Sequence, residues 1–160
     1  MLTLSKKAQI LPASPIRKLV PYADAAKKRG ITVYHLNIGQ PDIESPDVAL
    51  KAVKDNTLKL VAYPNSAGNE SYRKGLARYY QNIGIDVDYT DINVTTGGSE
   101  ALQIALTVTC DPDDEVIVLE PFYTNYNSFA IVNDVKFVPI TTSIDNGFAI
   151  PSIEEFERHI

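Results

Sequence analysis

Short apolar runs alternate with segments of helical spacing in the second half of the chain. The runs over 92–96, 116–120 and 135–140 are rich in β-branched residues, which predicts strands. Apolar residues in 99–110 and 124–132 recur three or four positions apart, as on one face of a helix. This regular alternation predicts βαβ units and a largely parallel sheet covered by helices, so the expected fold class is α/β.

The first half contains more turn signals and further segments of helical spacing. Ser14-Pro15 and Ser45-Pro46 are typical helix starts, because serine caps the first turn and proline is tolerated within it. Glycine after the last apolar residue is a typical helix end. The predicted elements are an extended arm over 1–13, helices over 14–30, 45–56 and 69–82, and a short strand over 31–36.

The last residues of the chain predict the beginning of one more helix. Ser152 and Glu155 have the spacing of a capping box, and Ile153, Phe156 and Ile160 share one helical face. No glycine or polar tail follows them. We therefore expect the chain to be part of a longer protein, while a frayed natural terminus stays open as the alternative.

Composition narrows the class of protein. The chain has 160 residues, which suits one domain, and 44% are hydrophobic, which indicates a globular protein. The net charge of −5 and the lack of a basic run argue against nucleic acid as a partner. A single cysteine, no signal-peptide pattern and no run long enough to span a bilayer favour a soluble, cytoplasmic protein without a membrane partner.

The metal-ligating residue types do not form a metal-site pattern. His35 and His159 are far apart in sequence, and the acidic run 111–114 lacks the spacing of a calcium-binding loop. A solvated turn between a helix and a strand explains this run better. We therefore predict no metal site in the chain.

The most informative stretch is Thr95–Leu102, where a predicted strand passes through two glycines into a predicted helix. Gly97 and Gly98 let the backbone approach a ligand, and the first amides of a helix have no partner within it. Ser99 adds a hydroxyl, so the stretch is a candidate anion site. An ordinary turn with Ser99 as N-cap is the alternative. The stretch lacks the lysine of a Walker loop and the glycine spacing of a dinucleotide fingerprint.

Six segments carry a resemblance that covers nearly the whole chain. They are Ser14–Arg17, Leu36–Asp42, Tyr63 with Gly68, Thr96–Leu102, Asp113–Val116 and Glu120–Tyr126. In this order they resemble the N-terminal part of class I/II aminotransferases of the aspartate aminotransferase superfamily. Those enzymes use pyridoxal 5′-phosphate (PLP) on the fold-type-I scaffold, a mostly parallel sheet covered by helices. The resemblance therefore implies the N-terminal part of that fold, in incomplete form.

The resemblance implies cofactor contacts at matching positions. Gly97, Gly98 and Ser99 match the loop whose amides hold the PLP phosphate, although Gly97 replaces the hydroxyl residue that usually begins it. Tyr123 matches the aromatic residue that stacks on the pyridine ring, with a core tyrosine at a helix start as the alternative. Tyr63 matches the tyrosine that reaches across the dimer to the partner's phosphate.

The resemblance also implies a substrate contact and a set of residues outside the chain. Gly39 matches the loop that approaches the substrate α-carboxylate, where a side chain would obstruct. The family's Schiff-base lysine would lie beyond Ile160. So would the Asp on the pyridinium nitrogen, the Asn and Tyr on the PLP oxygen, and the Arg on the substrate carboxylate. No catalytic residue is therefore assigned in this chain.

The implied protein is a homodimeric PLP-dependent aminotransferase that moves an amino group between an amino acid and a 2-oxo acid. Residues 1–45 would form the arm and part of the small domain, and residues 46–160 the first part of the large PLP-binding domain. The 160 residues alone are expected to be inactive. Two alternatives stay open. One is another fold-type-I enzyme, such as a carbon–sulfur lyase or a cyclopropane-carboxylate synthase; the other is a non-catalytic chain that only binds a phosphate ligand or a partner chain.

Overall fold

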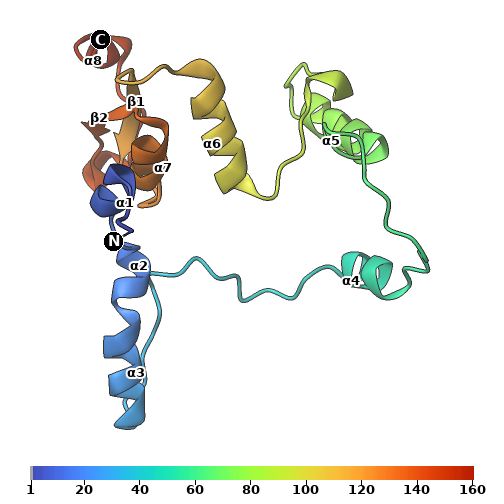
Figure 1. Ribbon diagram of the computed structural model, residues 1–160, viewed down its shortest axis with the longest axis horizontal. Coiled ribbons are helices and arrows are strands. Elements are labelled where there is room, and N and C mark those ends of the chain that lie inside the picture. The colour runs from blue at the N-terminus through green and yellow to red at the C-terminus, as the bar shows by residue number, and fades with distance from the viewer. Residues whose placement is uncertain (1) are drawn as a thin grey trace. The chain divides into compact units, whose positions relative to one another are not determined.

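The computed structural model describes residues 2–160 (Figure 1). The described chain divides into two compact units. The first unit contains the residues up to Ile38 together with Leu102–Ile160, and the second unit contains Gly39–Ala101.

A parallel two-stranded sheet organises the first unit. β1 (Glu115–Glu120) pairs with β2 (Lys136–Thr141), and Leu119 lies opposite Ile140 in the register. α7 (Tyr126–Asn133) connects the strands, because a parallel pair needs a crossover that returns the chain to the same end of the sheet. This βαβ unit confirms the strand, helix and strand predicted after residue 115.

The core of the first unit lies where α7 packs on β2. Phe129 and Ala130 of α7 are buried together with Val135 and Ile140. Asp134 ends α7 in the left-handed conformation, with φ 56°, which aspartate tolerates better than most residues. The turn is closed by a 3.0 Å bond from the Val135 N–H to the Ala130 carbonyl, so helix and strand pack directly after it.

The N-terminal arm, predicted to be extended, contains a short helix, α1 (Lys6–Ile10). The Ser5 hydroxyl caps it by accepting an amide of the first turn. The Lys7 ammonium donates to the Val132 carbonyl at 2.9 Å and lies 2.6 Å from the Asp134 carboxylate. This is the C-terminal end of α7, where a cation interacts favourably with the helix dipole. The extended-arm prediction was wrong because it overlooked the serine cap.

The helix predicted over 14–30 is divided into α2 (Pro15–Lys18) and α3 (Val20–Lys28). Pro21 explains the division, because proline lacks the N–H of a helical bond and its ring clashes with the carbonyl of the preceding turn. Gly30 adopts φ 78° after α3 and ends the helical segment as predicted.

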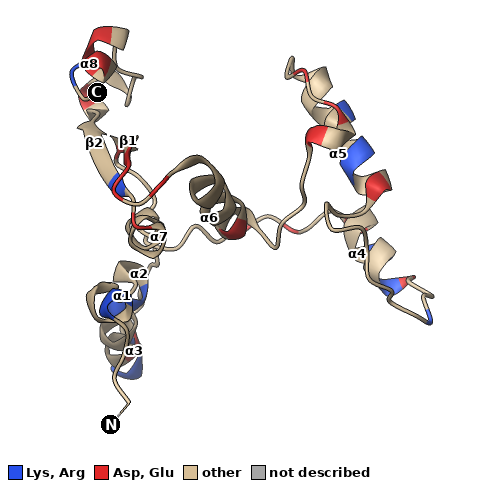
Figure 2. Cartoon of the chain, turned by 45° about the horizontal axis from the view of Figure 1, so that its top comes forward, with Lys and Arg blue, Asp and Glu red and all other residues tan. Residues whose placement is uncertain are grey.

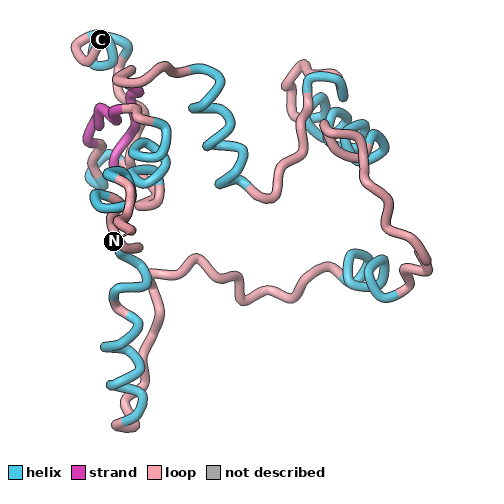
Figure 3. The backbone as a smooth tube through the Cα atoms, in the orientation of Figure 1, coloured by secondary structure: helices cyan, strands magenta, loops and turns pink. Residues whose placement is uncertain are grey.

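Two segments predicted as strands, 31–36 and 92–96, are irregular and are drawn as loop in Figure 3. The 92–96 segment is joined to a distant segment by one backbone bond, from the Val94 N–H to the Ala67 carbonyl at 3.0 Å. A strand exists only as part of a ladder, and within residues 2–160 the ladder is confined to β1 and β2. The strand predictions were wrong because sequence pattern does not supply the pairing partner.

The second unit is built around α5 (Glu70–Asn82), and α4 (Asp47–Lys54) precedes it. The Asn69 side chain caps α5 by accepting an amide of the first turn. Gly84 follows α5 with φ 85°. Both helices confirm the sequence prediction, because their start and stop signals are local and act without tertiary partners.

A buried arginine joins α5 to the 3₁₀ helix η1 (Tyr89–Asp91). Arg73 is 7% exposed and donates to the Tyr89 carbonyl at 3.0 Å, and its guanidinium lies 5.4 Å from the centre of the Tyr89 ring. Hydrogen bonds from the Thr90 N–H and hydroxyl hold the pKa of the Asp88 carboxyl below its usual range. η1 is therefore fixed both to α5 and by its own cap.

The remaining elements are α6 (Gly98–Thr109), η2 (Ile144–Asn146) and α8 (Ile153–Glu157). Glu100 is the charged residue of α6 and marks its first turn in red in Figure 2. α8 begins after Ser152 as predicted, although the Ser152 side chain makes no capping bond. Within residues 2–160, no helix is long and apolar enough to cross a membrane.

Candidate functional site

The glycine turn before α6 provides an open approach to the backbone. Gly97 has φ 86°, in the left-handed region that favours glycine. A Cβ built on Gly97 or Gly98 would meet no atom within 4 Å. The space beside both residues is therefore free for a ligand atom, and a side chain at either position would fill part of it.

Three backbone donors at the start of α6 have no acceptor within residues 2–160. The Gly97 N–H bonds the Thr95 carbonyl, and helical bonding begins with the Ala101 N–H on the Gly97 carbonyl at 3.4 Å. The N–H groups of Gly98, Ser99 and Glu100 lie between these two bonds. Unpaired amides and the positive end of the helix dipole together favour an anion at this turn.

The side chains around the turn leave these donors accessible. The Glu100 carboxylate accepts the Thr96 N–H and so is bound to the segment before the turn. Ser99 lies inside the first turn of α6, because the helix begins at Gly98, and its side chain is exposed. Its hydroxyl bonds no group in the described part of the chain. The alternative in which Ser99 is the N-cap is therefore wrong.

Thr95 has a role that sequence reasoning missed. Its hydroxyl donates to the Gly97 carbonyl at 3.0 Å and so fixes the turn from inside. The adjacent pair Thr95-Thr96 before two glycines was the available signal, because threonine hydroxyls commonly bond nearby backbone groups in turns.

Tyr123 belongs to the first unit and lies between β1 and α7. It is 48% exposed, so within residues 2–160 it is not buried as a core tyrosine. The Tyr123 ring makes an edge-to-face contact with the Tyr126 ring, with 5.8 Å between the two centroids. The Tyr123 hydroxyl accepts a 2.7 Å hydrogen bond from the Asn125 side-chain amide. The ring is thus oriented by neighbours while about half of its surface stays free for stacking.

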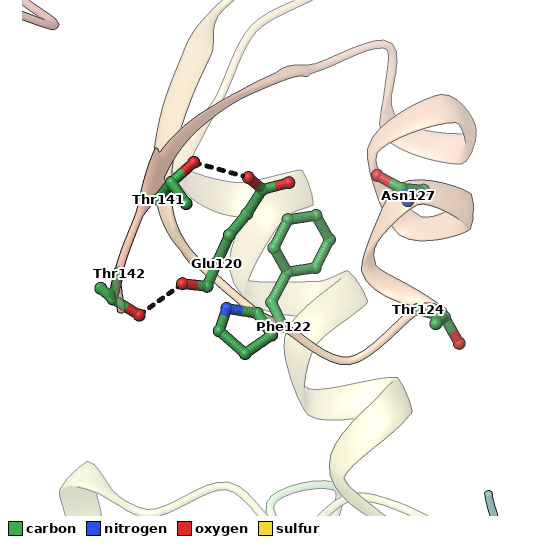
Figure 4. Close-up of a pocket in the computed structure, with 7 residues that line it drawn as sticks. Glu120, Phe122, Thr124, Asn127, Thr141 and Thr142 are labelled. Carbon is green, nitrogen blue, oxygen red and sulfur yellow. Dashed lines mark hydrogen bonds between the residues drawn. The ribbon is translucent and has the colours of Figure 1, made fainter. Parts of the chain in front are cut away.

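A hollow of about 430 Å³ lies at the C-terminal ends of β1 and β2 (Figure 4). Carboxyl ends of parallel strands are the usual place for ligands in open α/β sheets. The Thr141 hydroxyl bonds the Glu120 carboxylate and the Thr142 hydroxyl bonds the Glu120 carbonyl, so the polar groups of this wall are paired. Phe122 and Thr124 line the hollow on either side of Tyr123 in sequence.

The other predicted site residues are exposed in the second unit. Tyr63 is 102% exposed in the loop before α5, and Gly39 is exposed in irregular backbone with no atom within 4 Å of a built Cβ. The structure therefore places Gly39, Tyr63 and the Gly97–Ser99 turn in the second unit and Tyr123 in the first.

The donor set of the chain fits the phosphate of PLP. The turn offers unpaired amides, a free hydroxyl and open space, which suit a phosphate dianion. The half-exposed Tyr123 ring suits a flat heteroaromatic ring. The parallel βαβ unit defines an α/β protein. The glycine turn before α6 is, separately, a candidate site for a phosphate-type anion.

The sequence identifies the family more specifically. The family model described as "Aminotransferase class I and II" matches residues 31–155, and the chain belongs to this family. The resemblance inferred from the sequence is thus confirmed.

Relatives and solved structures agree with this assignment. The chain is 28% identical to a probable aspartate/prephenate aminotransferase of Rickettsia conorii, over 100% of this chain and 40% of the relative. It is 32% identical to an LL-diaminopimelate aminotransferase of Desulforudis audaxviator, over 85% of this chain and 38% of the relative. An aspartate aminotransferase structure from Thermotoga maritima matches with TM-score 0.84 and 30% identity, over 97% of this chain and 42% of that chain.

These comparisons fix the fold and the extent of the match. The chain has the α/β fold of the N-terminal part of fold-type-I aminotransferases. A structure of alanine aminotransferase from Pyrococcus furiosus also matches this fold, with TM-score 0.84 and 30% identity over 99% of this chain and 41% of that chain. The chain therefore spans about two fifths of the length of its relatives, as the 40% coverage of the Rickettsia conorii protein shows.

Proposed function

We propose that the full-length protein is a PLP-dependent aminotransferase and that these residues form the first part of its cofactor-binding scaffold. The observation that carries the proposal is the set of unpaired amides at Gly98, Ser99 and Glu100 beside an open glycine turn, in a chain of this family. The domain assignment is part of the proposal: residues 1–45 as arm and part of the small domain, and residues 46–160 as the start of the large domain.

Each proposed site residue has a physical task. PLP, when bound, supplies the electron sink of amino-group transfer. The amides of Gly98 and Ser99 hold its phosphate, the Ser99 hydroxyl donates to the same group, and the open Gly97 leaves room for it. These contacts fix the position and charge environment of the cofactor but move no proton themselves.

Three further residues of the chain complete the proposed contacts. The Tyr123 ring covers one face of the pyridine and shields it from water. The bare backbone of Gly39 leaves space for a substrate α-carboxylate. Tyr63 reaches the phosphate of a second copy in a homodimer, which its 102% exposure in this chain supports.

The proposed substrates are an amino acid and a 2-oxo acid. The similar proteins carry names with aspartate, prephenate, LL-diaminopimelate and alanine, so the donor side chain is left open. The other fold-type-I activities share the same N-terminal motifs, and we place them second because no similar protein reported above is named for them.

The test is product analysis on the full-length protein with PLP, a panel of amino acids and 2-oxoglutarate. Formation of glutamate with a matching 2-oxo acid supports the proposal. Release of a thiol or of a cyclopropane carboxylate would move the protein to one of the alternative enzymes. PLP binding without any turnover of the panel would support a non-catalytic phosphate-binding role.

Replacing Tyr123 by alanine in the full-length protein should weaken PLP binding by about 1–3 kcal/mol, by analogy with base–aromatic stacking. Tyr123→Phe should be nearly silent, because the hydrogen bond that the Tyr123 hydroxyl accepts from the Asn125 amide lies at the surface, where water can replace the hydroxyl. The measurement is PLP affinity by titration. The matched control is Tyr22→Ala, which removes an exposed tyrosine of the same unit. Equal damage from the alanine and phenylalanine variants would contradict stacking and point to the hydroxyl.

A further inference from the structure

Gly68 makes an unusually close backbone contact in the second unit. A Cβ built on it would lie 2.6 Å from both the Cβ and the Cγ2 of Val94. Real Cβ atoms do not approach so closely, and among the glycines of residues 2–160 no other built Cβ meets an atom within 4 Å. Gly68 also has φ 98°, and the Val94 N–H donates to the carbonyl of the neighbouring Ala67 at 3.0 Å.

This contact fixes the segment that runs into the anion turn. The side chain of Val94 lies against the bare backbone of Gly68, and the next residue, Thr95, bonds the Gly97 carbonyl through its hydroxyl. Thr96 then donates its N–H to the Glu100 carboxylate. Consecutive contacts thus lead from Gly68 to the unpaired amides at the start of α6.

The same segment is anchored at its other end by α5. The buried Arg73 donates to the Tyr89 carbonyl at 3.0 Å, directly before residues 92–96. Because 92–96 has no strand partner within the described residues, these two contacts take the place of a ladder. The Arg73 contact holds the beginning of the segment, and the Gly68 contact holds the part next to the turn.

We propose that Gly68 is a positioning residue for the phosphate-binding amides, because its lack of a side chain lets Val94 lie against it and so sets where Gly98 and Ser99 present their N–H groups. The inference rests on the proposed function. It also joins two elements directed at phosphate groups, since the loop that ends at Gly68 begins with Tyr63. A shift at Gly68 would then disturb the chain's own site and, through Tyr63, the site of a second copy.

The test compares Gly68→Ala with Gly84→Ala in the full-length protein. Gly84 has φ 85° and open space around it, so its variant carries the cost of alanine at positive φ without a clash. Both variants are titrated with PLP and with pyridoxal, which lacks the phosphate. Gly68→Ala should lose about tenfold or more in PLP affinity relative to Gly84→Ala, as overpacking energies imply, while pyridoxal affinity changes equally in both.

The choice of ligands separates positioning from general destabilisation. A merely structural role would weaken PLP and pyridoxal alike, whereas a displaced phosphate cradle weakens PLP alone. Equal PLP affinities of Gly68→Ala and Gly84→Ala would overturn the inference. If the unmodified protein itself binds PLP no more tightly than pyridoxal, the proposed phosphate site fails as well, so the two failures are distinguishable.

A second pair of variants changes Val94, the other partner of the contact. It keeps the inference testable if Gly68→Ala alone does not fold. Val94→Gly removes all three atoms of Val94 that lie within 4 Å of the new Cβ, including the two at 2.6 Å, so Gly68→Ala with Val94→Gly should bind PLP like Val94→Gly alone. Val94→Ala should not rescue, because the Cβ of Val94 is itself one of the two atoms at 2.6 Å. A folded double variant with Val94→Gly that still loses PLP preference would overturn the inference.

Discussion

A Ser99→Glu variant of the full-length protein is expected to lose PLP binding altogether. Ser99 lies in the first turn of α6, next to the unpaired amides. A glutamate there would offer its carboxylate to these donors, compete with the phosphate dianion for them and repel it by its negative charge. Ser99→Ala removes one hydroxyl donor and should cost only about 1 kcal/mol of binding free energy. PLP absorbance after gel filtration measures retention in both variants.

The matched control for added charge is Ser71→Glu. Ser71 occupies the same position in α5 as Ser99 does in α6, the second residue of the helix, and it is likewise exposed. The Asn69 side chain already accepts a hydrogen bond from the Ser71 N–H, so no phosphate site is expected at the start of α5. Full PLP retention by Ser99→Glu would show that the phosphate lies elsewhere and would remove the main support for the proposed cofactor contacts.

Residues 1–160, purified alone, are expected to show neither cooperative unfolding nor transamination. In the described chain the buried apolar residues are few, namely Ala77, Phe129, Ala130, Val135 and Ile140. Large side chains such as Leu36, Leu60 and Val61 are mostly exposed. The parallel pair of β1 and β2 has no third strand within residues 2–160, and isolated two-stranded sheets are marginally stable at best.

The measurements are thermal and urea unfolding, PLP absorbance and turnover with an amino donor and 2-oxoglutarate. The full-length protein, treated identically, is the reference and should unfold cooperatively. A second chain or segment that covers the apolar residues should restore cooperativity to residues 1–160. A monomer of these residues that unfolds in one sharp transition and transaminates would contradict the prediction and place a functional catalytic group inside this sequence.

Local signals allowed much of the fold to be predicted. α5 begins at an asparagine cap and ends before a glycine with positive φ, and both signals are visible in the sequence. The βαβ unit from β1 to β2 could be predicted as well, because its partners are consecutive in the chain. The strand predicted over 92–96 failed because a strand needs a pairing partner, which a local sequence pattern does not identify.

The candidate site was predictable to a similar extent. The glycine turn and Ser99 could be identified from residue types alone. Two glycines and a serine between a predicted strand and a predicted helix indicate a turn with unpaired amides. The close contact of Gly68 with Val94 was not predictable, because it depends on the sign of φ and on tertiary neighbours. The bond from the Asn125 amide to the Tyr123 hydroxyl was not predictable either, because it depends on how the two side chains are oriented in the folded chain.

The ion pair that attaches the N-terminal helix through Lys7 makes this attachment sensitive to ionic strength. The ion pair with Asp134 leaves 47% and 49% of the two side chains exposed, so dissolved salt screens it readily. The βαβ core that receives it is held by apolar packing, which salt does not screen. Raising the ionic strength should therefore loosen the first residues while the sheet stays intact. Trypsin would then cut at Lys6 or Lys7 earlier than at sites within the core.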